Sequence, residues 1–171
     1  VLRKNIRLVG GIPLIAHTIN AAKGSVKLTS FVTSTEDEKI ADISREYESE
    51  VIKRPLELAG DRTPMIPVIE SVLSTVESTM GYQDYIVLLQ PTTPMRSSDD
   101  IDNAISIILN TGADSVISVY QVEDHHPSRM YNIIDNRLVP YTTEPPGSLR
   151  QELPPVYHRN GAIYAFKRSL L

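Results

Sequence analysis

The sequence predicts an α/β fold, in which helices alternate with the strands of a mainly parallel sheet. Between residues 12 and 119, segments with apolar residues at helical spacing alternate with short apolar runs, which is typical of repeated β-α units. One run, Tyr85–Leu89, is continuously apolar, as in a strand covered on both faces. Hydrophobic residues make up 41% and charged residues 22% of the 171 residues, an ordinary composition for one globular domain.

Four segments have the apolar spacing of helices, at 13–24, 36–47, 66–76 and 98–109. Pro13 suits the first helical position of the first segment, and Gly24 suits its end. Ser98 can cap the fourth, whose first turn carries Asp99 and Asp100. The side chains expected to face the core from the last three helices are Ile40, Ile43, Tyr47, Ile66, Ile69, Val72, Leu73, Val76, Ile101, Ile105, Ile108 and Leu109.

The expected strands lie between these helices, at 28–33, 50–52, 85–89, 115–119 and, after a long interruption, 162–166. The runs at 85–89 and 115–119 are apolar enough to be buried strands. In sheets of this kind, ligands bind beyond the carboxyl ends of the parallel strands. We therefore expect the segments 34–37, 53–55 and 90–92 on one rim.

The interruption, residues 121–159, departs from this pattern and is rich in Pro, His, Arg and Tyr. Within it, Tyr131–Ile134 and Arg137–Val139 flank Asp135-Asn136, a pattern typical of a small hairpin. A long excursion before a core strand is uncommon unless it has a function. We therefore expect it to contribute to the same rim.

Composition and charge exclude several classes of protein. Lys and Arg number 17 against 21 Asp and Glu, so the chain lacks the basic surplus usual in nucleic-acid binding. Cysteine is absent, which excludes disulfides, thiolate zinc sites and a cysteine nucleophile. No apolar run approaches the roughly 18 residues of a membrane span, and no signal-peptide pattern opens the sequence. We expect a cytoplasmic protein.

The most specific motif is Leu88–Arg96, L-L-Q-P-T-T-P-M-R. A buried strand here leads to an amide, two hydroxyls and a guanidinium on the rim, and two prolines stiffen the turn. Such a turn can hold Gln90 toward a polar ligand. The alternative is a Pro-rich connection in which Ser98 caps the next helix.

Three other groups each allow two interpretations. The basic cluster at residues 3–7, R-K-N-I-R, can hold phosphates or form a solvated end. His125-His126 can suggest a metal site, but a hydrogen-bonded loop is favoured because no third ligand stands at helical spacing. Arg150 and Arg159 flank two prolines and can capture a carboxylate or lie on the surface. No Ser-His-Asp set, Walker loop or dinucleotide fingerprint is present.

Several segments occur together in an informative order. In chain order they are Lys4-Asn5, Ser34-Thr35, Arg54–Ala59, Asp61, Leu88–Arg96, His125–Pro127, Arg150–Pro154 and Asn160–Tyr164. Through them the chain resembles the acylneuraminate cytidylyltransferases, also called CMP-sialic acid synthetases. The resemblance spans almost the whole chain. Each segment is weak alone, and the ordered set is strong.

The resemblance implies a Rossmann-like nucleotide-diphospho-sugar transferase fold, with helices on both faces of the sheet and one domain over residues 1–171. It implies that CTP and a nine-carbon 2-keto acid sugar give a CMP-sugar and pyrophosphate, with Mg²⁺. The sugar's anomeric hydroxyl attacks the α-phosphorus, so catalysis is mostly positioning and charge neutralisation. The excursion at 122–156 resembles the family's dimerisation segment, which implies a homodimer.

The family's binding residues carry over by motif match. The nucleotide-binding positions are Lys4, Asn5, Arg54 and Asp61. The sugar-binding positions are Gln90, Arg129, Arg150, Arg159 and Asn160. Two departures stand out: the family's R-P-N-G-A appears here as H-R-N-G-A (158–162), which shifts the arginine by one, and Arg62 replaces a residue that is commonly small.

Two of the family's parts have no counterpart in the sequence: the opening strand with its basic R-x-x-S-K-G loop, and the metal-binding D-x-D. No metal ligand is therefore assigned. Because the sequence begins without methionine and ends just after an expected strand, we expect a piece of a longer protein that is inactive alone. The alternatives are a CMP-Kdo synthetase or other sugar nucleotidyltransferase, and a non-catalytic nucleotide-binding fragment.

Overall fold

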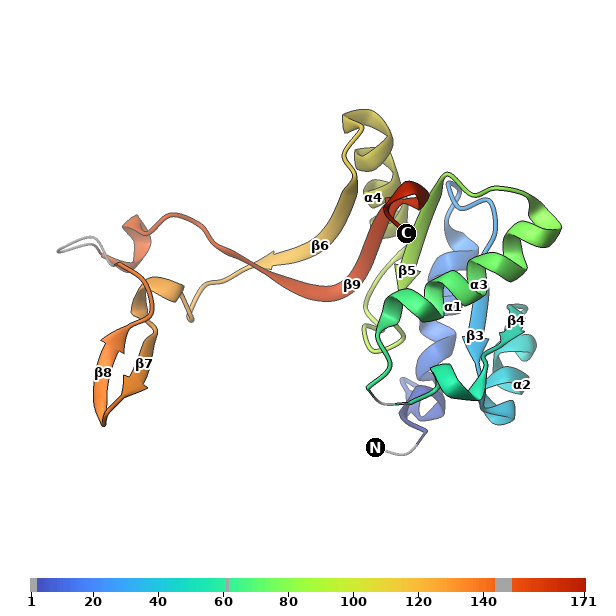
Figure 1. Ribbon diagram of the computed structural model, residues 1–171, viewed down its shortest axis with the longest axis horizontal. Coiled ribbons are helices and arrows are strands. Elements are labelled where there is room, and N and C mark those ends of the chain that lie inside the picture. Colours follow the sequence, from blue (N-terminus) through green and yellow to red (C-terminus); the bar gives the residue numbers. More distant parts are fainter. Residues whose placement is uncertain (1–2, 61, 144–148) are drawn as a thin grey trace. The chain divides into compact units, whose positions relative to one another are not determined.

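The computed structural model describes residues 3–60, 62–143 and 149–171. The chain divides into a main unit, Val1–Ile117 with Gly161–Leu171, and a small unit, Ser118–Asn160. The helices are α1 (Leu14–Gly24), α2 (Glu38–Glu46), α3 (Met65–Met80) and α4 (Ser98–Thr111) (Figure 1). The strands are β1 (Leu8–Val9), β2 (Ile12–Pro13), β3 (Val32–Thr35), β4 (Glu50–Lys53), β5 (Tyr85–Leu89), β6 (Ser115–Gln121), β7 (Tyr131–Ile134), β8 (Arg137–Pro140) and β9 (Tyr157–Lys167). This alternation confirms the predicted α/β class.

The strands pair in both directions. β3 is parallel to β4, with Val32 opposite Glu50. A second sheet has the order β5-β9-β6, in which β9 returns antiparallel to β5 and Ile163 lies opposite Leu89. The pairs β1–β2 and β7–β8 are antiparallel, and the second of these confirms the predicted hairpin. The sheet elements are thus mixed, since the returning strand β9 adds antiparallel pairing to the expected parallel pattern.

The amino-terminal end of α4 differs from its prediction by one residue. Ser97, not Ser98, is the cap: its hydroxyl oxygen accepts from the Asp100 N–H at 3.1 Å, and its own N–H donates to Asp100 Oδ2 at 2.8 Å. Ser98 instead packs against Gly24 at the end of α1, where a Cβ would collide with the Ser98 hydroxyl. Gly24 therefore permits the close approach of α1 and α4.

β3 begins at Val32, later than the predicted residue 28. The reason is a contact with α4. Asp102 accepts from the Ser25 hydroxyl and from the N–H groups of Val26 and Lys27, both at 3.1 Å. The Leu28 N–H also donates to the Ser25 hydroxyl oxygen at 3.2 Å, so residues 26–28 are held in a turn and the strand ladder does not begin at residue 28.

The core of the main unit lies between α1, α4 and β9. Its buried cluster consists of Ala21, Ile101, Ala104, Ile105, Ala162 and Ile163. The predicted inward positions in α4 are confirmed except for Leu109, which is 52% exposed because Ala104 completes the buried face on the other side. In α3, Leu73 is buried as predicted, whereas Ile66 is 56% exposed in the first turn.

The buried positions of α2 differ from the prediction. Ala41 and Ser44 are the buried side chains, while the larger apolar residues predicted to face inward are only half-buried. Small residues allow α2 to approach β3, β4 and α1, which it contacts. The buried Ser44 hydroxyl is satisfied because it donates to Ile40 O at 2.8 Å.

Two strands are less covered than expected. β5 is half-buried from Ile86 to Leu89, and β6 leaves Ile117 and Val119 exposed. β6 is exposed because it is the outer strand of β5-β9-β6. Among the strands that the structure describes, β3 pairs only with β4, and β5 only with β9. One edge of each therefore has no ladder partner.

Candidate functional site

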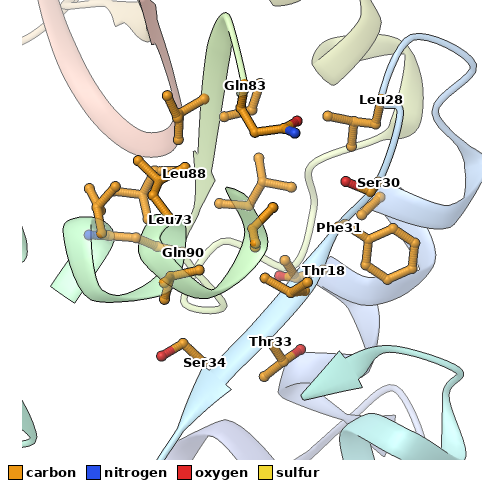
Figure 2. A pocket seen from close by; sticks show the side chains of 18 of the residues that line it. Thr18, Leu28, Ser30, Phe31, Thr33, Ser34, Leu73, Gln83, Leu88 and Gln90 are labelled. Carbon is orange, nitrogen blue, oxygen red and sulfur yellow. The ribbon is translucent and has the colours of Figure 1, made fainter. Parts of the chain in front are cut away.

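A cavity of about 700 Å³ lies in the main unit, with walls that include β3, β5, α1 and α3. Figure 2 shows Leu28 and Gln83, which precede β3 and β5, toward one end of this cavity, and Ser34 and Gln90 toward the other. The two strands therefore run in the same direction. Their carboxyl ends meet at one end of the cavity, which is where α/β sheets bind ligands.

Three residues predicted from the sequence line this one cavity: Asn5, Arg54 and Gln90. Part of the expected rim, namely residues 34–36, Arg54 and residues 90–91, contributes to the walls of the cavity. Lys4 precedes Asn5 in a short 3₁₀ turn and is exposed. Asp61 lies outside the described residues.

Asn5 presents an unusual atom to the site. Its side-chain Oδ1 is buried and has no hydrogen-bond partner among the described residues. Leaving such an acceptor unsatisfied costs about 1–3 kcal/mol. A ligand hydroxyl or amino group that reached Oδ1 would remove this cost.

Arg54 is held at the end of β3. Its main-chain N–H donates to Thr35 O at 3.0 Å, which continues the β3–β4 ladder. Its guanidinium Nη2 donates to Ser34 O at 2.8 Å, and Nη1 lies 3.8 Å from the Glu36 carboxylate. The arrangement fixes a positive charge where β3 opens into the cavity, as a group that neutralises phosphate requires.

Gln90 follows β5 and is half-buried. A Cβ on Gly161 would lie 3.5 Å from Gln90 Oε1, so the glutamine carboxamide sits directly beside this glycine. Gly161 has φ +74, a conformation that L side chains rarely adopt. Glycine therefore provides the backbone shape beside Gln90, where an added Cβ would make only an ordinary van der Waals contact with the carboxamide.

The cytidylyltransferase family model matches residues 1–168. The chain belongs to the cytidylyltransferase family. It is 33% identical to post-translational flagellin modification protein B of Campylobacter coli, over all of this chain and 73% of that protein. It is 35% identical to CMP-N,N'-diacetyllegionaminic acid synthase of Legionella pneumophila, over 94% of this chain and 69% of that enzyme.

The relatives differ in length. An N-acylneuraminate cytidylyltransferase of Streptococcus agalactiae is 32% identical over 94% of this chain, which spans only 38% of that enzyme. These relatives confirm the resemblance found in the sequence. A solved CMP:2-keto-3-deoxy-manno-octonic acid synthetase complexed with CTP has a TM-score of 0.72 at 17% identity, over 98% of this chain and 68% of that one. This likeness confirms the nucleotide-sugar transferase type of fold.

Arg96 of this cytidylyltransferase is not on the rim, contrary to the sequence prediction. It is 6% exposed, and its guanidinium donates to Gln90 O at 3.2 Å, Ala162 O at 2.6 Å and Thr18 Oγ1 at 2.7 Å. Burial lowers the pKa of Arg96 below its ordinary value, and the charge of Asp100 opposes this shift. The sequence motif gave no signal of this inward orientation, because two of the partners lie 66 and 78 residues away.

The other four predicted sugar-binding residues belong to the small unit. Arg129, Arg159 and Asn160 are exposed, and Asn160 Oδ1 accepts from the Ser118 hydroxyl at 2.6 Å. Arg150 begins a 3₁₀ turn, and its side chain lies outside the described set. The small unit thus carries four of the five predicted sugar-binding residues, while Gln90 is in the main unit.

The interpretation of His126 as part of a hydrogen-bonded loop agrees with its contacts. Its Nδ1 accepts from the Ser128 N–H at 3.1 Å, and Nε2 lies 3.0 Å from Pro154 O. Within residues 3–60, 62–143 and 149–171, no three His, Cys, Asp or Glu side chains form a group that could hold a metal ion. In the same part of the chain, no helix is both long and apolar enough to span a membrane.

Proposed function

We propose that this cytidylyltransferase transfers CMP from CTP to a nonulosonic acid, a nine-carbon 2-keto sugar acid. The observation that carries the proposal is that Asn5, Arg54 and Gln90, far apart in the sequence, line one cavity at the carboxyl ends of β3 and β5. The names of two relatives, which refer to N-acylneuraminate and diacetyllegionaminic acid, support the choice of sugar.

The nucleotide is assigned to Lys4, Asn5, Arg54 and Asp61. The fixed guanidinium of Arg54 at the end of β3 neutralises phosphate charge, and the exposed Lys4 ammonium is free to approach the same phosphates. Asn5 Oδ1, which lacks a protein partner among the described residues, accepts a hydrogen bond from a hydroxyl or amino group of the nucleoside.

The sugar acid is assigned to Gln90, Arg129, Arg150, Arg159 and Asn160. The carboxamide of Gln90 binds sugar hydroxyls, and the arginines bind the carboxylate. A bond forms between the anomeric oxygen and the α-phosphorus as the bond to the bridging oxygen breaks, which releases pyrophosphate; the hydroxyl proton is lost to solvent. Because no covalent enzyme intermediate is needed, the residues act by positioning and by charge neutralisation.

Mg²⁺ is part of the proposal because the family resemblance implies it. The side chains of the described residues do not fit a metal site, so no step is assigned to the ion here. A cytoplasmic location, where CTP is made, belongs to the same proposal.

A homodimer is also proposed, through the β7–β8 hairpin. In its register, Ile133 lies opposite Leu138 and Tyr131 opposite Pro140, so the four side chains share one face. Ile133 is 74% exposed and Leu138 68% exposed. An apolar face of this kind is typical of a surface that a partner covers, and a second copy offers the same face in a two-fold arrangement.

The nucleotide and sugar are tested together by pyrophosphate release from the protein expressed from the complete gene. CTP, UTP, ATP and GTP are each supplied with N-acetylneuraminic acid, a legionaminic acid or Kdo, in the presence of Mg²⁺. We expect CTP with a nine-carbon acid to exceed every other nucleotide by about tenfold or more, since a site built to bind one base's polar groups strongly rejects others. Equal rates with UTP contradict the nucleotide assignment, and a preference for Kdo contradicts the sugar.

A further inference from the structure

Arg96 joins three elements of the main unit through one side chain. Its Nη1 donates to Gln90 O at 3.2 Å, just after β5, and to Ala162 O at 2.6 Å in β9. Its Nη2 donates to Thr18 Oγ1 at 2.7 Å in α1. The planar guanidinium presents its donors in a fixed fork, so these contacts set the spacing between the end of β5, β9 and α1.

Stability alone does not explain why this charged side chain is buried. Arg96 is only 6% exposed, its hydrogen-bond acceptors are uncharged, and its Nε has no hydrogen-bond partner among the described residues. The nearby carboxylate that acts on its charge, Asp100, belongs to the capping box of α4. Replacing a buried charged group by apolar residues of similar volume is often neutral or stabilising. A core position filled for stability alone would favour an apolar side chain.

The contacts of Arg96 converge on Gln90. The main-chain carbonyl of Gln90 is held by the guanidinium, while its carboxamide lies beside Gly161, whose added Cβ would be 3.5 Å from Gln90 Oε1. Ala162, the next residue after Gly161, provides another of the acceptors of Arg96. One guanidinium therefore controls both the backbone from which the Gln90 side chain projects and the strand against which that side chain rests.

We propose that Arg96 is a positioning residue that holds Gln90 in the orientation in which its carboxamide reaches the sugar acid in the cavity. This inference rests on the proposed function for the identity of the ligand. Its geometric part, that Arg96 fixes Gln90, stands on the contacts alone. Lysine cannot replace it, because an ammonium group is a point charge and does not present a planar fork to acceptors on three elements.

The test is a double-mutant cycle in the protein expressed from the complete gene, with Arg96→Lys, Gln90→Ala and both together. We expect Arg96→Lys to raise the KM for the sugar acid about tenfold, as for loss of charge-assisted hydrogen bonds, while the KM for CTP changes by less than about twofold. In the Gln90→Ala background the same substitution should change the sugar KM by less than about twofold, because coupled residues are not additive. Additive effects, or an equal change in both KM values, overturn the proposal.

A second readout needs no activity. The side-chain amide signals of Gln90 in a ¹H–¹⁵N spectrum of the ligand-free protein should shift in Arg96→Lys and, to a smaller extent, in Thr18→Val, which removes one acceptor and keeps the guanidinium. They should not shift in Arg45→Lys, a control on the exposed ion pair with Asp42. Unchanged Gln90 signals in both test variants overturn the positioning role even if the enzyme is active. Shifted signals in a protein that makes no CMP-sugar support it and refute the proposed function alone.

Discussion

The buried side-chain oxygen of Asn5 lowers the stability of the free protein, and we propose that it strengthens nucleotide binding. Its Oδ1 is buried in the cavity wall without a hydrogen-bond partner among the described residues. We expect Asn5→Ala to leave the free energy of unfolding unchanged or to raise it by about 1 kcal/mol, because it removes an unsatisfied acceptor. The same variant should raise the KM for CTP about two- to tenfold through loss of one hydrogen bond. Urea unfolding and initial rates measure the two effects.

The matched control for this prediction is Asn103→Ala, which removes a carboxamide from an exposed position on α4. It should leave both quantities unchanged. A fall in stability of Asn5→Ala, with no change in its KM for CTP, would show that the Asn5 side chain is a structural group and does not contact the nucleotide.

Asp102 makes the stability of the fold depend on pH. The Ser25 hydroxyl, with the N–H groups of Val26 and Lys27, holds the pKa of Asp102 below its ordinary value of 3.8. Because the folded pKa is lower than the unfolded one, the carboxylate stabilises the fold above the unfolded pKa, and this contribution is lost as the pH falls through the folded pKa. We expect the urea midpoint of the unchanged protein to fall more steeply below about pH 4 than that of Asp102→Asn.

Asp99→Asn is the control for Asp102, since it removes an equal charge from an exposed position in the first turn of the same helix. Its acid profile should follow that of the unchanged protein. Parallel profiles for Asp102→Asn and the unchanged protein would be inconsistent with an effect of this carboxylate on stability.

At the scale of the element, the dimer proposal can be tested by substitutions in the β7–β8 hairpin. Ile133 and Leu138 lie opposite each other and are exposed. Burying a side chain of this size stabilises an interface by about 1.5–3 kcal/mol, so we expect Ile133→Lys with Leu138→Lys to raise the dimer dissociation constant at least about a hundredfold. Sedimentation equilibrium measures it.

The control lies on the other face of the same hairpin. Asn132 stands opposite Val139 and not opposite the apolar pair, so Asn132→Lys adds a charge without touching the proposed contact. It should sediment as the unchanged protein does. If all three proteins have the same mass in solution, the hairpin face is not a dimer interface.

The helices were predictable because their signals are local. α1 begins directly after Pro13 and ends at Gly24, as predicted to within one residue. The apolar spacing of α4 identifies the face that is buried. The start of β3 was not predictable from nearby residues, because Asp102, more than 70 residues away, holds Val26 and Lys27 in a turn. Local patterns therefore located the elements, and a distant side chain changed one boundary.

At the scale of the whole molecule, part of the candidate site could be predicted from the sequence and part could not. Arg54 and Gln90 could be predicted as neighbours because residues after parallel strands meet at one edge of the sheet, whereas Asn5, in a 3₁₀ turn near the start of the chain, was assigned by motif match alone. The inward orientation of Arg96 could not, because it depends on Thr18 and Ala162, which come from the opposite ends of the chain. Two of the proposed ligand-binding residues, Arg54 and Gln90, follow strand ends, whereas the proposed positioning residue Arg96 depends on tertiary packing.

The open strand edges of the main unit lead to a prediction about the 171-residue chain itself. Among the described strands, β3 and β5 each lack a partner on one edge, and both border the cavity of about 700 Å³. Unpaired backbone groups that are removed from water cost about 1–3 kcal/mol each, which is large against a typical total stability of about 5–15 kcal/mol.

We expect this polypeptide, purified alone with CTP, Mg²⁺ and a panel of nonulosonic acids, to form no CMP-sugar above background. Turnover by the 171-residue chain at ordinary enzyme rates would show that the open edges of β3 and β5 do not limit its folding, and that every group needed for the reaction lies within these residues.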